Sequence, residues 1–87
     1  MSTIRDAIYL ENIDEVKRML EEEPNLIDER DENGVPMALL SAKTGNLKLV
    51  RYIVEYSRAS MDITDNEHRN MLHYAAMSGS IDVCKYL

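Results

Sequence analysis

Three side chains, His68, His73 and Cys84, are of the types that act as general bases, metal ligands or nucleophiles. No pair of them has a recognised metal-ligand spacing, and a single cysteine supplies only one sulfur. The sequence also lacks a glycine-rich phosphate loop, a nucleophile elbow and a metalloprotease motif. We therefore expect no enzyme activity, no metal and no cofactor, and we expect His73 to bond to neighbouring loop backbone.

The composition describes a small acidic domain. The chain has 87 residues and a net charge of −6, with eleven acidic and four basic side chains in residues 1–35. Nothing basic clusters, so nucleic acid and anionic membrane surfaces are poor partners on electrostatic grounds. One cysteine cannot form an internal disulfide, and the longest apolar run, Val35 to Leu40, is too short to span a membrane. We expect a cytoplasmic, reducing environment.

A shift of 34 residues brings two stretches of the sequence into register. The positions Asp31, Met37, Ala42, Gly45 and Tyr52 fall on Asp65, Met71, Ala76, Gly79 and Tyr86. The same shift backwards places Ile13, Val16 and Met19 under Leu47, Val50 and Ile53. The sequence thus predicts three related units in one domain, at residues 1–30, 31–64 and 65–87, with the third cut short.

Within each unit the apolar spacing is helical. It predicts short helices over Ile4 to Leu10, Pro36 to Thr44 and Asn70 to Ser78. Longer helices are predicted from Ile13, from Leu47 to about Tyr56, and from Ile81. Each longer helix follows a capping residue, namely Asn12, Asn46 or Ser80, and Thr3 with Asp6 forms a predicted capping box. Asn33-Gly34 predicts a tight turn in the loop between units.

These residues resemble the ankyrin repeat family. The resemblance rests on Asp31-Glu32-Asn33-Gly34 with Ala42 and Gly45, and on Leu72-His73-Tyr74-Ala75-Ala76 with Gly79. One departure is His68, which stands where the preceding unit has the turn residue Gly34. The resemblance implies a mainly α fold, an ankyrin-type helix-turn-helix/β-turn repeat solenoid of about 2.5–3 repeats. Cys84 takes the place of Val50, so we expect a buried, inert thiol.

The resemblance also implies a non-catalytic scaffold that binds another protein through a concave groove. Its groove-lining positions correspond here to Glu32, Asn33, Val35, Lys43, Thr44, Asn66, Glu67, Arg69, Met77 and Ser78. Among these we expect Arg69 and Met77 to be the main anchors, because an exposed Met is typical of a contact surface.

Two other functions stay open from the sequence. The chain could be an N-terminal targeting or regulatory segment of a larger enzyme or effector. It could also self-associate through its C-terminal end. We expect the apolar residues Ile81, Val83, Cys84 and Leu87 to contact both the short helix of their own unit and a following unit, and no polar cap follows them. We accordingly expect the natural protein to continue with at least one more repeat.

Overall fold

The computed structural model describes residues 3–55 and 62–87. In these ranges the helices are α1 (Ile4–Tyr9), α2 (Ile13–Glu22), η1 (Pro24–Asp28), α3 (Met37–Lys43), α4 (Leu47–Glu55), α5 (Met71–Ser78) and α6 (Ile81–Tyr86). The predicted short helices are confirmed to within one residue at each end. The predicted end of the fourth helix, Tyr56, lies outside the described residues.

The helices begin at the predicted capping residues. Thr3 and Asp6 form the capping box, in which the Thr3 hydroxyl accepts from the Asp6 amide at 3.2 Å. Asn46 Oδ1 accepts from the Leu49 amide at 3.2 Å, and Ser80 Oγ accepts from the Val83 amide at 3.3 Å. These side chains satisfy backbone donors that the first turn of a helix leaves unpaired.

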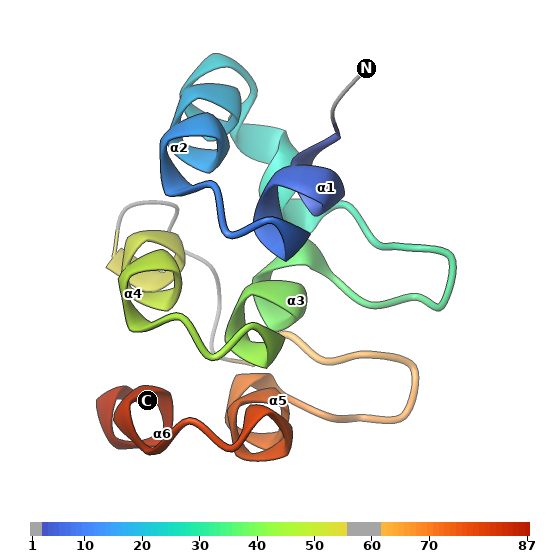
Figure 1. The fold of residues 1–87 in the computed structure, drawn as a ribbon. Helices are drawn as coiled ribbons and strands as arrows, with labels where there is room; N and C mark the ends of the chain where they lie inside the picture. The colour runs from blue at the N-terminus through green and yellow to red at the C-terminus, as the bar shows by residue number, and fades with distance from the viewer. Residues whose placement is uncertain (1–2, 56–61) are drawn as a thin grey trace.

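Two rows of helices make up the fold (Figure 1). The first helices of the pairs, α1, α3 and α5, stack in one row, and α2, α4 and α6 stack in the other. The loops before α3 and before α5 project side by side from the first row as two fingers. The described residues therefore form a mainly α solenoid of three helix pairs, in which each pair packs against the next.

Helix α3 occupies the middle of the first row and forms the centre of the core. All of its residues from Met37 to Ala42 are buried, since α1 covers one side and α5 the other. In the second row, Val16, Val50 and Val83 are each 0 % exposed. Within the described ranges, no helix has the length and apolar character needed to cross a membrane.

The sequence missed one element, the 3₁₀ helix η1. The whole of 25–35 was expected to be an extended loop, yet Pro24–Asp28 forms a helical turn. Proline at its first position is already set to the helical φ and needs no amide partner there. Ile27 is 6 % exposed and joins the core, which holds this turn against α2 and α3.

The fingers are closed by a carboxylate at the base of each one. In the finger before α3, Asp31 Oδ1 accepts from the amides of Asn33 and Val35 at 2.8 and 2.9 Å. The finger before α5 repeats this arrangement, because Asp65 Oδ1 accepts from the amides of Glu67 and Arg69 at 2.8 and 2.9 Å. The predicted Asn33-Gly34 turn is confirmed, and Gly34 has a φ of +78°.

Cys84 is less buried than the expected buried thiol. Its thiol is partly buried and packs at the edge of the core, whereas Val50, its equivalent in the middle pair, is 0 % exposed. The reason is position. In the second row α4 lies between α2 and α6, whereas α6 packs against α4 and α5 and has no described helix on its other side.

The left-handed turn residues yield a test of the fingers. His68 has a φ of +64°, a conformation that costs a residue with a Cβ about 1–2 kcal/mol. Glycine at this position removes that conformational cost, but part of the gain in stability is offset because glycine has more conformational freedom in the unfolded chain. We expect His68→Gly to raise the free energy of unfolding by up to about 1 kcal/mol in urea denaturation.

The matched control is Gly34→Ala at the equivalent position. A Cβ there would collide with the Asn66 side chain and would also have to adopt the unfavourable φ, so we expect this change to lower stability. A His68→Gly variant less stable than the parent chain contradicts the interpretation that this turn is strained.

Candidate functional site

The four predicted contact residues at the tips of the two fingers are exposed, and the tips lie next to one another. Glu32, Asn33, Asn66 and Glu67 all occupy exposed positions at the tips. Asn66 Nδ2 donates to the Asn33 carbonyl at 3.4 Å, so the tips touch. Arg30 ties the fingers together more firmly, since its guanidinium donates both to the Gly34 carbonyl at 2.8 Å and to the residue 64 carbonyl at 3.0 Å.

The prediction that Val35 lines the binding groove is wrong. It is 8 % exposed and packs in the core beneath its finger, so its side chain is not presented to a partner. Its backbone explains the position, because the Val35 amide bonds to Asp31 and the Val35 carbonyl accepts from the Asp31 amide at 2.9 Å. These bonds fold the finger back so that the Val35 side chain turns inward.

Thr44 and Ser78 are half-buried and hold the turns between paired helices. The Thr44 hydroxyl donates to the Ser41 carbonyl at 2.7 Å and accepts from the Asn46 amide at 3.2 Å. Ser78 does the same in the last pair, donating to the Ala75 carbonyl at 2.6 Å and accepting from the Ser80 amide at 3.2 Å. Both hydroxyls are therefore engaged within the turns.

Lys43 and Met77, by contrast, are exposed at the ends of α3 and α5. Their equivalent in the first pair, Tyr9, was not among the predicted contact residues, although the 34-residue shift that relates Lys43 to Met77 also relates Tyr9 to Lys43. Tyr9 is 53 % exposed, and the following Leu10 is 78 % exposed. We call Tyr9, Lys43 and Met77 the first-helix stripe.

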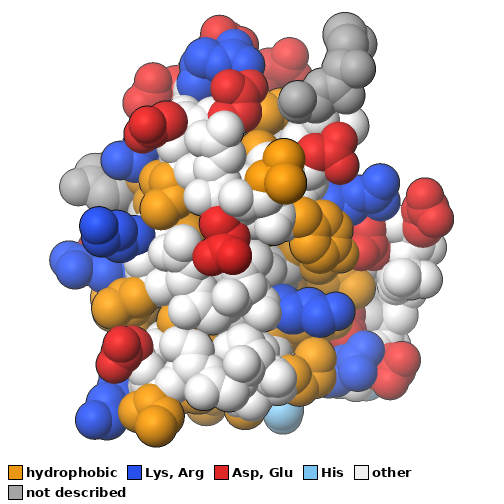
Figure 2. Space-filling view, viewed as in Figure 1, with side chains coloured by type: hydrophobic (Ala, Val, Ile, Leu, Met, Phe, Trp, Pro, Cys, Tyr) orange, Lys and Arg blue, Asp and Glu red, His pale blue; other side chains and the backbone are white. Residues whose placement is uncertain are grey.

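The stripe runs across all three helix pairs. Figure 2 shows hydrophobic side chains over α1 and over α5, with a basic side chain over α3 between them. Three of the five large hydrophobic side chains exposed among the described residues are Tyr9, Leu10 and Met77. Apolar side chains gathered in this way, with polar ones around them, are typical of a protein-binding surface.

Arg69 has a structural role in addition to its predicted place on the surface. Its Nε lies 2.7 Å from Asp65 Oδ2, and the same oxygen accepts from the Tyr74 hydroxyl at 2.6 Å. The guanidinium also lies 5.6 Å from the centre of the Tyr74 ring. Asp65 is 5 % exposed, so Arg69 compensates a buried charge and is fixed at the base of its finger.

The same contacts shift two pKa values. Burial raises the pKa of Asp65, but the hydrogen bonds from Tyr74, Arg69 and the finger amides outweigh it, and the net result is a pKa well below the usual range. Burial, followed by the hydrogen bond to Asp65, raises the pKa of Tyr74 to about 12. The cluster is therefore held as a carboxylate with a neutral phenol throughout the neutral range.

His73 has the structural role predicted for it. Its Nδ1 accepts from the Asn70 amide at 3.1 Å, and Asn70 Oδ1 accepts from the His73 amide at 3.0 Å. This reciprocal pair caps α5. No set of three or more His, Cys, Asp or Glu side chains is placed to hold a metal ion in the described ranges.

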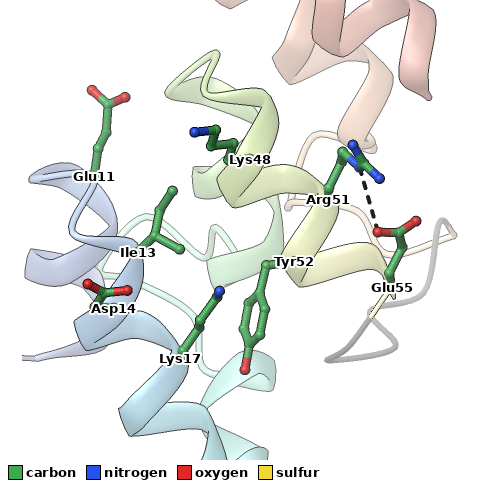
Figure 3. A pocket seen from close by; sticks show the side chains of 8 residues that line it. All are labelled: Glu11, Ile13, Asp14, Lys17, Lys48, Arg51, Tyr52 and Glu55. Carbon is green, nitrogen blue, oxygen red and sulfur yellow. Dashed lines mark ion pairs between the residues drawn. The ribbon is translucent and has the colours of Figure 1, made fainter.

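A hollow of about 520 Å³ lies between α2 and α4, in the second row of helices (Figure 3). Its walls carry three acidic and three basic side chains with one aliphatic and one aromatic: Glu11, Ile13, Asp14, Lys17, Lys48, Arg51, Tyr52 and Glu55. Arg51 pairs with Glu55 at 3.7 Å, and the Lys17 amine lies 5.5 Å from the Tyr52 ring centre. With its charges balanced in this way, the hollow is a weaker candidate site than the stripe.

Comparison with known proteins agrees with the repeat. The family model for ankyrin repeats in three copies matches residues 4–87. The chain belongs to the ankyrin repeat family. It is 34% identical over 82 residues to ankyrin repeat and SAM domain-containing protein 6 from Mus musculus, an alignment that covers 93% of this chain and 9% of that protein.

A solved structure shows the same ankyrin architecture. One chain of the complex between the predatory endopeptidase Bd0816 from Bdellovibrio bacteriovorus and the immunity protein Bd3460 superposes with a TM-score of 0.84. The match covers 99% of this chain and 44% of that one, at 19% sequence identity. At this identity the likeness shows the fold.

The buried cluster yields a pH-dependent prediction. Tyr74→Phe removes a donor to a buried carboxylate, which we expect to cost about 1–3 kcal/mol of unfolding free energy at neutral pH. Because the folded pKa of Tyr74 is raised, its contribution is complete below the unfolded value near 10 and is lost as pH rises to about 12. The difference in unfolding free energy between the parent chain and Tyr74→Phe must therefore become smaller between pH 10 and 12.

Denaturant unfolding at a series of pH values measures this difference in unfolding free energy. Tyr9→Phe alters an exposed tyrosine and is the control, since we expect it to leave stability unchanged. A Tyr74→Phe variant as stable as the parent chain at neutral pH contradicts the role assigned to the cluster.

Proposed function

We propose that this ankyrin repeat chain is a non-catalytic scaffold that binds another protein through the first-helix stripe and the adjacent finger tips. Ankyrin repeats generally mediate protein–protein interaction, and the family is typically non-catalytic. A chain of the same fold occurs in a complex of two proteins. The observation that carries the proposal is the exposure of Tyr9 and Met77, 53 % and 52 %, at equivalent positions on one face.

The revised anchors follow from the contacts of each side chain. Met77 keeps its place among them, and Tyr9 joins it, because both expose apolar surface that a partner can cover. Arg69 is replaced as an anchor, since its guanidinium is already paired with Asp65 and is 39% exposed. The finger residues Glu32 and Glu67 form the polar edge of the proposed contact.

The test is capture of partners by cross-linking in a native lysate, followed by mass spectrometry. We expect the double variant Tyr9→Ser with Met77→Ser to keep its helical circular dichroism and to lose the proteins that the parent chain captures. Ile81→Ser is the matched control for the capture of other proteins, because Ile81 is an apolar side chain on α6 that is 68 % exposed and lies outside the stripe; capture of a second copy of the chain is scored separately. Equal capture by the double variant and the parent chain contradicts the proposal.

We further propose that the outer side of α5 and α6 packs against a second copy of the chain. Leu72 is 49 % exposed, while its equivalent in the middle pair, Ala38, is 0 % exposed and covered. Cys84 is likewise only partly buried, whereas its equivalent Val50 is fully buried. The last pair thus exposes positions that the middle pair covers by stacking, and such surface is a site of association.

Sedimentation velocity at several concentrations tests this proposal. We expect the parent chain to form dimers as its concentration rises, and Leu72→Glu to remain monomeric, because a charge on the contact surface opposes its burial. Leu10→Glu places the same charge on an exposed leucine of the first pair and leaves the dimer intact. A parent chain that is monomeric at every concentration contradicts the second proposal.

A further inference from the structure

The first-helix stripe has a chemical order as well as a position. Tyr9 and Met77 stand at its two ends, with exposed fractions of 53 % and 52 %, and the exposed Lys43 stands between them. Helix α3 packs against both α1 and α5, so the three side chains follow one another across adjacent helices. The order is therefore apolar, basic, apolar, as Figure 2 shows over these helices.

The charge of Lys43 is uncompensated within the described part of the chain, where no acidic side chain forms an ion pair with it. The acidic side chains at the finger tips already have arginine partners. Glu32 lies 3.9 Å from the guanidinium of Arg5, and Glu67 lies 3.6 Å from that of Arg69. The basic charge at the centre of the stripe is thus available to a ligand.

A partner that covers both ends of the stripe must also cover its centre. Contact with Tyr9 and Met77 excludes water from the space between them, and a lysine that loses its water without gaining a counter-charge costs free energy. Lysine is accordingly depleted in protein interfaces, whereas tyrosine and methionine are enriched. The stripe therefore requires a partner that brings an acidic group to Lys43.

We infer that the stripe recognises a protein segment in which an aspartate or glutamate lies between two apolar side chains. This inference rests on the proposed protein-binding function and adds the chemistry of the partner. The carboxylate pairs with Lys43, and the apolar side chains cover Tyr9 with Leu10 at one end and Met77 at the other. The ion pair supplies specificity, while the apolar contacts supply most of the affinity.

Selection from a displayed library of random peptides tests the inference on the full chain. Peptides of about 16 residues are long enough to cross two helix-to-helix steps of about 8–10 Å each, whether extended or helical. We expect the parent chain to enrich peptides with an acidic residue flanked on both sides by apolar ones. Lys43→Glu is expected to select a basic residue at that place and to bind the parent's peptides about tenfold more weakly.

Lys48→Glu is the matched control. Lys48 is an exposed lysine of α4 in the second row of helices, so the same change of charge there leaves the selected peptides unaltered. One result overturns this inference but leaves the proposed function standing. In it, the selected peptides are apolar, their binding requires Tyr9 and Met77, and Lys43→Glu changes neither their sequence nor their affinity. Both this inference and the proposed function are overturned if no peptides are enriched, or if the double variant Tyr9→Ser with Met77→Ser enriches the same peptides as the parent chain.

Discussion

Burial of α3 from both sides is the constraint on which the rest of the structure depends. Because α1 and α5 cover its two sides and α4 and η1 also pack against it, α3 is buried from Met37 to Ala42, and its first exposed side chain is Lys43 at the very end. The same geometry governs the neighbouring helices, which expose Tyr9 and Met77 at the same point. The stripe exists because α3 exposes a side chain only at its end, and α1 and α5 expose apolar side chains at the equivalent position.

The fingers depend on a second, more local arrangement. Asp31 and Asp65 each accept two amides of their own loop, and these bonds set where the tips stand relative to the helices. The second finger adds Tyr74 and Arg69 around a buried carboxylate, where the first has the aliphatic Leu40 and Val35. The two fingers therefore share a backbone and differ in what stabilises it.

Much of this fold could be predicted from the sequence because the repeat constrains many positions at once. The helix ends and caps follow from a 34-residue register and from side chains that bond locally, as Asn46 and Ser80 do. Burial was harder to predict, since it depends on neighbours in space. Val35 and Arg69 occupy equivalent surface positions in the register, but one packs in the core and the other neutralises Asp65. The exposure of Tyr9 could have been predicted by applying the register to the first helix.

The central claim is that partners bind the ends of α1, α3 and α5 and not the hollow between α2 and α4. Nuclear magnetic resonance of the ¹⁵N-labelled chain, titrated with a peptide selected on it, tests this claim most directly. We expect the largest amide shifts to fall at Tyr9, Lys43 and Met77 and to extend to the finger tips. Shifts concentrated at Lys17, Lys48 and neighbouring residues of the hollow would contradict it.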